Sequence, residues 1–230
     1  MRQGTGPPRA RTPPGGCPAG LIADIGELVL VRALQWTATW RRAGVVGADF
    51  WMSVNVSTRQ LRDDRIVRTL RRELAATGLP ACALSLEITE SVMLDDSEVT
   101  QRVLMDLRAL GVRLVVDDFG TGYSALGYLR RHPVTGVKID RSFVDGLGRD
   151  SQDEEIVRAV VAMASALGLS VVAEGVEREE QRQVLQSFGV QHGQGHLWGR
   201  AVDAVAFAVS PATVQTRLAD EIMAAPTVPG

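Results

Sequence analysis

The segment Arg113-Leu114-Val115-Val116-Asp117-Asp118-Phe119-Gly120 joins a short apolar, β-branched run to two consecutive acidic residues. Similar strand-like runs recur along the chain, at Phe50–Val56, Ala83–Thr89, Gly136–Ile139 and Ser170–Ala173. Longer amphipathic stretches lie between such runs, among them Glu98–Leu110 and Glu154–Leu167, which end at Gly111 and Gly168. Glycine at this position tolerates the left-handed conformation that closes a helix. The pattern therefore predicts alternating strands and helices.

Alternating strands and helices indicate an α/β fold in which helices cover parallel strands. Periodicity alone leaves a doubly wound sheet and a closed barrel open. The polar residues favour a barrel, because they end or closely follow the apolar runs, and in a parallel barrel all strand ends open on one face. These residues are Asn55, Glu87, Asp117, Asp118, Asp140 and Glu174. Like charges that converge there repel one another unless cations lie between them, so the pattern predicts a metal site.

The composition excludes several classes of protein. With 230 residues, of which 45% are hydrophobic and 23% charged, the chain suits one compact domain with a sizeable core. The formal net charge of -2 supplies no broad basic field for a nucleic-acid polymer and no polybasic membrane anchor. The longest uncharged stretch, Ala159–Ala173, is too short to span a bilayer. Cys17 and Cys82 form no disulfide framework, which favours a reducing, cytoplasmic location.

Residues 1–20 differ from the rest of the chain. Of these 20 residues, 15 are Gly, Pro, Arg or Ala, so we expect a non-homologous or disordered segment. From residue 21 the pattern becomes helical, with an apolar face formed by Leu28, Leu30, Val31, Leu34, Trp36 and Trp40. We expect the barrel domain over residues 21–224 and a tail over 225–230. Near its end we expect a strand-like run at Val205–Val209 and a closing helix from Pro211 to about Met223.

Six short motifs occur in a fixed order along the chain. They are Val54-Asn55-Val56-Ser57, Glu87-Ile88-Thr89-Glu90-Ser91, Asp117-Asp118-Phe119-Gly120-Thr121-Gly122-Tyr123-Ser124, Lys138-Ile139-Asp140, Ala173-Glu174-Gly175-Val176-Glu177 and Gln194-Gly195. In this order they resemble the EAL domain family of bacterial cyclic di-GMP phosphodiesterases, over residues 20 to 200 of this chain. The Asp-Asp-Phe-Gly-Thr-Gly string is highly specific, and the five other motifs agree with it.

The resemblance implies a modified TIM (β/α) barrel that hydrolyses cyclic di-GMP to the linear dinucleotide with two ions of Mg²⁺ or Mn²⁺. It implies that the metal ligands or their neighbours are Asn55, Glu87, Asp117, Asp118 and Glu174. By the same resemblance Lys138 would hold the attacking water, Glu174 would also be the base, and Gln194 would support the water or the metal shell. Glu90 would brace the substrate loop, which consists of Phe119, Gly120, Thr121, Gly122, Tyr123 and Ser124.

This chemistry is also reasonable on physical grounds. Phosphodiester hydrolysis depends on positioning and on neutralising the charge that develops on oxygen, rather than on covalent work by side chains. Carboxylate and amide oxygens suit Mg²⁺ or Mn²⁺, which activate a water on one side and stabilise the leaving oxygen on the other. The residue types at the predicted rim therefore match the chemistry that the resemblance implies.

Other interpretations stay open for some of these residues. Lys138 also fits a surface lysine at a strand end, and Asp140 fits a helix cap. Glu177 fits the acidic first turn of a helix together with Glu179 and Glu180, and this interpretation is favoured for it. Asp140 and Glu177 are thus candidates for either a structural or a functional role.

Two weaker patterns are set aside. His192 and His196 have the helical spacing of zinc ligands, but the glycines around them argue against a helix there. The Gly120-x-Gly122-x-x-Ala125 pattern fits the loose dinucleotide fingerprint of oxidoreductases. Asp117 and Asp118 directly before it would repel a pyrophosphate, so we do not expect a dinucleotide cofactor.

The chain departs from the family at its beginning. The Glu-Ala-Leu motif of the family's first strand, whose glutamate is a metal ligand, is absent, and the family's spacing back from Asn55 places it at or before Met1. We therefore expect a barrel without its first strand, in which a shifted reading frame or wrong start produced residues 1–20. The alternative to an enzyme is then a non-catalytic cyclic di-GMP-binding or regulatory module. The resemblance also implies a homodimer and a GGDEF or sensory domain that is lost or separate.

Overall fold

The computed structural model describes residues 21–95, 97–120, 126–209 and 215–217. These residues form a seven-stranded sheet whose strands follow one another in chain order. The first six strands are parallel and the last is antiparallel to its neighbour. They are β1 (Met52–Val56), β2 (Leu84–Thr89), β3 (Arg113–Phe119), β4 (Gly136–Ile139), β5 (Ser170–Glu174), β6 (His192–Gln194) and β7 (Gln215–Arg217).

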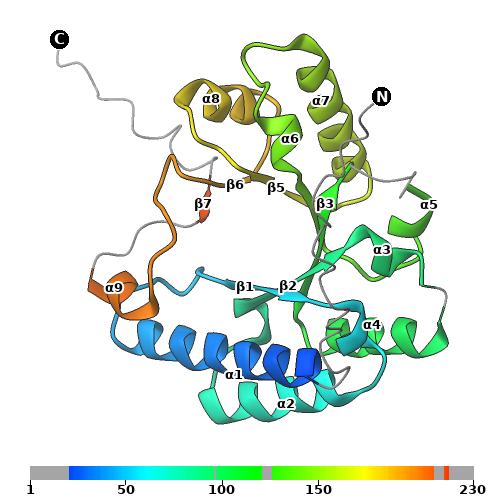
Figure 1. Cartoon of the computed structure of the whole chain (residues 1–230), viewed down its shortest axis with the longest axis vertical. Coiled ribbons are helices and arrows are strands. Elements are labelled where there is room, and N and C mark those ends of the chain that lie inside the picture. The colour runs from blue at the N-terminus through cyan, green and yellow to red at the C-terminus, as the bar shows by residue number, and fades with distance from the viewer. Residues whose placement is uncertain (1–20, 96, 121–125, 210–214, 218–230) are drawn as a thin grey trace, which may run out of the picture.

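Helices lie outside the curled sheet; the first precedes β1 and the others lie between successive strands along the chain (Figure 1). They are α1 (Leu21–Arg42), α2 (Arg65–Thr77), α3 (Glu90–Met93), α4 (Glu98–Ala109), α5 (Leu126–Leu129), α6 (Arg141–Val144), α7 (Ser151–Ala166), α8 (Glu179–Ser187) and α9 (Ala204–Val209). Two 3₁₀ turns, η1 (Thr58–Leu61) and η2 (Ala81–Ala83), complete the described elements. The parallel order and the curl confirm an α/β fold of the TIM-barrel type, here in the form of a half-barrel.

The core lies between the sheet and the helices around it. Strand β2 is buried on both faces from Leu84 to Ile88, as expected for a central strand of a parallel sheet. Leu104 and Leu107 of α4 are fully buried and belong to the same cluster as Leu114 of β3. This packing fixes the central strands and therefore the positions of the residues at their carboxyl ends.

Aromatic contacts connect the start of β1 with β6. Strand β1 pairs with β2 alone among the described residues, so its outer edge lies at one end of the sheet. Trp51, directly before β1, packs edge-on against His192 of β6 with ring centroids 4.8 Å apart. The guanidinium of Arg113 lies 4.4 Å from the centre of the Trp51 ring, and Trp40 of α1 contacts Phe207 of α9. Side-chain packing therefore connects parts of the fold that are not neighbours in the sheet.

Most of the predicted elements are confirmed. The five predicted strands correspond to β1 to β5, with ends that differ by up to three residues, and the first helix begins at Leu21. Gly111 and Gly168 have φ values of 93° and 68°, which confirms their role in ending helices. None of the helices in the described segments is long and apolar enough to cross a membrane.

Three predictions near the ends of the chain are wrong. Leu28 is 57% exposed rather than part of the buried face of α1. Val205–Val209 lies in helix α9, where Phe207 alone is buried, because a short apolar run fits a helix as well as a strand. Residues 215–217 form β7 instead of continuing the helix predicted from Pro211 to about Met223. The predictions for residues 1–20 and 218–230 lie outside the described residues.

Two neighbouring residues of α4 test the position of the core. We expect Leu104→Ala to lower the free energy of unfolding by about 2–5 kcal/mol, because it leaves a cavity at a fully buried site. The matched variant Met105→Ala changes a side chain that is 63% exposed, so its effect should stay within about 0.5 kcal/mol. Urea denaturation of both variants measures the difference. Equal midpoints would contradict the orientation of α4.

Candidate functional site

The register of the sheet places several of the predicted site residues on one face. Asn55 of β1 pairs with Glu87 of β2, and Glu174 of β5 pairs with Gln194 of β6. Side chains of residues paired across parallel strands point to the same face, and each pair lies near the carboxyl end of its strands. The predicted rim is therefore present in the fold.

A bulge in β3 brings two consecutive carboxylates to this rim. The register of β3 against β4 shifts between Val116 and Phe119, so Asp117 and Asp118 face a single residue of β4, Lys138. Asp118 has a φ of 53°, the left-handed conformation that non-glycine residues rarely adopt. In a regular strand two successive side chains point to opposite faces. The bulge and the left-handed residue remove this restriction.

Lys138 lies at the centre of the site. Its side chain is 5% exposed, and its Nζ lies 2.9 Å from Oε2 of Glu87, 3.2 Å from Oδ1 of Asp117 and 3.3 Å from Oε2 of Glu174. The ammonium group donates a hydrogen bond to Glu87. The Asp117 Oδ1 atom is buried and has an ion pair but no hydrogen bond. The interpretation of Lys138 as a surface lysine is therefore wrong.

The charges at the site do not balance. Burial alone would lower the pKa of Lys138, but Glu87, Asp117 and Glu174 outweigh burial and hold that pKa well above its usual range. Burial raises the pKa of Glu174, and the nearby Asp117 raises it further, although Lys138 opposes both. Burial and then the charge of Asp117 also raise the pKa of Asp118. One ammonium group thus faces four carboxylates, and the site favours an additional positive charge.

The residues present fit a divalent cation. Carboxylate oxygens of Asp117, Asp118 and Glu174 lie within 4.8 Å of one another. Hard oxygen ligands of this kind suit divalent cations, and the Asp117 oxygen without a hydrogen bond is available to one. Glu87 is not part of this group of three, and Asn55 is exposed on β1, which pairs with the strand of Glu87. Their role as ligands stays a prediction.

A cavity of about 220 Å³ adjoins the acidic group. Glu174, Glu177 and Gln194 line it together with Arg141, His196 and Arg200. Arg141 was not among the site residues predicted from the sequence, because nothing in its surroundings except the adjacent Asp140 signals it. The two arginines therefore place positive charge beside a carboxylate centre, and Glu177 pairs with one of them.

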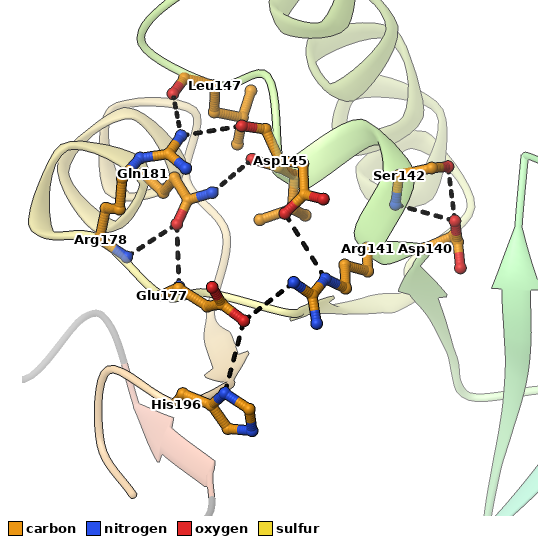
Figure 2. Close-up of polar contacts among 10 residues, drawn as sticks. Asp140, Arg141, Ser142, Asp145, Leu147, Glu177, Arg178, Gln181 and His196 are labelled. Atoms are coloured by element: carbon orange, nitrogen blue, oxygen red, sulfur yellow. Dashed lines mark hydrogen bonds and ion pairs between the residues drawn. The ribbon is translucent and has the colours of Figure 1, made fainter. Parts of the chain in front are cut away.

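Asp140 and Glu177, for which two interpretations were open, have different roles in the structure. Asp140 caps α6, because its Oδ1 accepts a hydrogen bond from the backbone N–H of Ser142, and this bond, with the Ser142 hydroxyl, lowers its pKa (Figure 2). The predicted acidic first turn is confirmed for Glu179 and Glu180 of α8 but is wrong for Glu177, which precedes the helix. Its Oε1 lies 2.9 Å from the guanidinium of Arg141 and 3.4 Å from Nδ1 of His196 (Figure 2).

Part of the predicted substrate loop lies outside the described residues. Thr121, Gly122, Tyr123 and Ser124 belong to the segment that the structure does not describe. Phe119 is buried at the end of β3, and Gly120 follows with a φ of 100°. Glu90 begins α3 directly after β2, which places it near the rim. The gating role of the loop and its support by Glu90 stay predictions.

Comparison with known proteins agrees with this geometry. The family model of the EAL domain matches residues 17–201. This chain belongs to the EAL domain family. The bifunctional diguanylate cyclase/cyclic di-GMP phosphodiesterase MucR of Pseudomonas aeruginosa is 42% identical over 185 residues, which cover 80% of this chain and 27% of MucR. The solved MucR phosphodiesterase in complex with c-di-GMP has a TM-score of 0.75 at 41% identity and covers 82% of this chain and 75% of that chain.

Two further solved EAL structures have the same fold. The EAL domain of Mycobacterium smegmatis DcpA has a TM-score of 0.78 at 40% identity, covering 85% of this chain and 87% of that chain. Klebsiella pneumoniae BlrP1, solved as a manganese/cy-diGMP complex, has a TM-score of 0.68 at 30% identity. The match covers 83% of this chain and 50% of that chain. This EAL chain spans about a quarter of the length of its curated relatives.

Replacement of Lys138 tests the charge balance of the EAL site. We expect Lys138→Met to lower the stability of the metal-free protein at pH 8 by about 3–5 kcal/mol, because the buried carboxylate of Glu87 and the partly buried ones of Asp117 and Glu174 lose their partner. The ammonium group lowers the pKa of Glu174, so its removal should favour protonation of this carboxyl toward pH 5 and reduce the difference from wild type. Thermal unfolding across this pH range measures the effect.

An exposed ion pair provides the control. Arg68 pairs with Asp64 on the surface of α2. Arg68→Met should change stability by less than about 1 kcal/mol at either pH, because solvent screens such a pair. A loss for Lys138→Met that is as small as the loss for Arg68→Met would contradict the central role of Lys138.

Proposed function

We propose that this domain hydrolyses cyclic di-GMP to the linear dinucleotide with divalent cations. The observation that carries the proposal is the convergence of carboxylate oxygens from Asp117, Asp118 and Glu174 beside the buried Lys138 and a cavity that Arg141 and Arg200 line. A phosphodiester ligand carries negative charge, which cations bound by these carboxylates and the two arginines would offset. The similarity to the MucR phosphodiesterase solved with c-di-GMP supports this choice of substrate.

The carboxylates at the rim would hold the metal. We propose two ions, Mg²⁺ or Mn²⁺, with Asp117, Asp118 and Glu174 as ligands and with Asn55 and Glu87 as the remaining oxygen donors. Bound divalent cations lower the pKa of water and stabilise the leaving oxygen of a phosphodiester. The manganese complex of BlrP1 supports the choice of a divalent cation.

The other side chains act on the water and the phosphate. Glu174 would take a proton from the attacking water. The oxygen of this water would form a bond to phosphorus while the bond from phosphorus to the 3′ oxygen of the ribose breaks. The raised pKa of Glu174, which burial and Asp117 cause, favours this transfer, and solvent would protonate the leaving 3′ oxygen. Lys138 would offset the charge that develops on the phosphate. Gln194, paired with Glu174 across the strands, would orient the water.

The proposal also covers the cellular location of the domain and its partners. We propose a cytoplasmic location, which the free thiol of Cys82 supports because thiols persist in reducing compartments. Cyclic di-GMP is the proposed ligand, with a second copy of the chain and a GGDEF or sensory domain as proposed partners. The relative MucR, whose name combines a diguanylate cyclase with a phosphodiesterase, supports the last of these.

A hydrolysis assay tests the proposed function. We expect wild-type protein with Mn²⁺ to convert cyclic di-GMP to the linear dinucleotide, and chelation of the metal to stop the reaction. Glu174→Gln should lower kcat about 10²–10⁴-fold, because the amide cannot accept the proton. Chromatography of the nucleotides measures the product. Saturable binding of cyclic di-GMP without any product would reject the enzyme and favour a binding or regulatory module.

The affinity for metal should depend on pH. Burial raises the pKa values of Glu174 and Asp118, so protons compete with Mn²⁺ for these carboxylates. We expect the affinity for Mn²⁺ to fall as the pH is lowered from neutral toward the carboxyl range, with protons taken up as the metal leaves. Calorimetric titration at several pH values measures this dependence. An affinity that stays constant over this decrease in pH would contradict the proposed ligands.

A further inference from the structure

Several polar side chains outside the metal group are completely buried, and one of them is the carboxamide of a glutamine. Gln181, in the first turn of α8, has no exposed surface. Its Oε1 accepts hydrogen bonds from the backbone N–H of Glu177 at 2.9 Å and of Arg178 at 2.8 Å. Its Nε2 donates to the carbonyl oxygen of Val144 at 2.9 Å. All three bonds thus run to backbone groups of other segments or of the turn before α8 (Figure 2).

These bonds are part of a closed ring. Val144 is the last residue of α6, and Arg141 is the first. The Arg141 guanidinium binds Glu177, whose own N–H binds Gln181, so the ring passes from α6 to the segment before α8 and back (Figure 2). Arg178 adds an outer clamp, because its guanidinium donates to the carbonyl oxygens of Asp145 and Leu147. Gln181 is the buried connection between the two segments.

The ring faces the cavity beside the acidic group. Arg141 and Glu177 line this cavity together with Glu174, which lies three residues before Glu177. On the other side the same segment is held by backbone hydrogen bonds from Val176 to Gln194 and from Leu197 to Val176. The residue before Glu177 is thus held by backbone hydrogen bonds to β6 and the loop after it. The backbone of Glu177 itself is held by Gln181, which also connects it to α6.

The close approach of Gly195 leaves this segment little freedom. A Cβ atom at Gly195 would lie 2.1 Å from the carbonyl oxygen of Val176, so the two backbones are in direct contact. The backbone of Val176 therefore has no room to move toward β6. A change in the position of Glu177 must come from the side of α6, which is the side that Gln181 controls.

We propose that Gln181 is a positioning residue for substrate, which holds the Glu177–Arg141 pair in the orientation that contacts the cyclic dinucleotide. The proposal rests on the proposed function of the site. Gln181 does not touch the acidic group, and Glu174 is held independently by the pairing of β5 with β6. Loss of the Gln181 bonds should therefore weaken the binding of substrate and leave both the metal site and the chemical step intact.

The experiment compares three variants of the full chain. Gln181→Leu removes all three bonds and retains a buried side chain. Gln181→Glu keeps an acceptor for the N–H groups of Glu177 and Arg178 but loses the donor to Val144. Gln183→Leu is the matched control, because Gln183 is exposed on the same helix and donates a hydrogen bond to Glu179.

Two measurements separate a positioning role from a structural one. In Gln181→Leu we expect amide exchange across residues 175–180 to become at least about tenfold faster, because the N–H groups lose their buried acceptor. We expect KM for cyclic di-GMP to rise about tenfold while kcat stays within about threefold, the signature of lost substrate binding. Mn²⁺ affinity should stay unchanged. Gln181→Glu should restore most of the amide protection and part of the KM, and Gln183→Leu should match wild type.

Other outcomes would overturn the proposal. A Gln181→Leu variant with wild-type KM, or with kcat and Mn²⁺ affinity lost together with thermal stability, would show that Gln181 is only structural. Wild-type amide exchange in this variant would show that it does not hold the segment. A wild-type chain that neither hydrolyses nor binds cyclic di-GMP would instead reject the proposed function, and the amide exchange would still decide whether Gln181 fixes the segment.

Discussion

The buried ammonium group of Lys138 is the interaction on which the site depends. Its three carboxylate partners come from β2, β3 and β5, and Lys138 itself comes from β4. Four strands must therefore keep their register and their curl for these atoms to meet, and removal of the cation would leave buried charges without compensation. One ammonium cannot neutralise the carboxylates it contacts. The same constraint that holds the rim together thus makes it a site for further cations.

The bulge in β3 explains how so much negative charge reaches one place. A regular strand would direct Asp117 and Asp118 to opposite faces, and one of the two would point away from Glu174. The left-handed conformation of Asp118 avoids this at a cost of about 1–2 kcal/mol for a residue with a Cβ atom. Proximity of like charges adds to that cost in the metal-free protein. A bound cation would offset both, which is consistent with strain kept at a functional site.

The sequence allowed the rim to be predicted but not its details. Acidic residues at the ends of apolar runs were sufficient, because parallel strands direct their carboxyl ends to one face. The bulge could not be predicted, since it depends on the register between two strands. The burial of Lys138 and of Gln181 could not be predicted either, because each is polar and becomes buried only through tertiary contacts. The short run Val205–Val209 was misread because five apolar residues fit a helix and a strand equally well.

The segment from Glu174 to Arg178 joins the metal group to the wall of the cavity, and its two ends are supported in different ways. Glu174 is part of the sheet, so its position follows from backbone pairing with β6. Glu177 lies beyond the sheet, and side chains of α6 and α8 fix it. Backbone pairing tolerates many substitutions, whereas a buried carboxamide that makes three specific bonds does not. Residues that shape the wall can therefore change the affinity for substrate while the metal ligands stay in place.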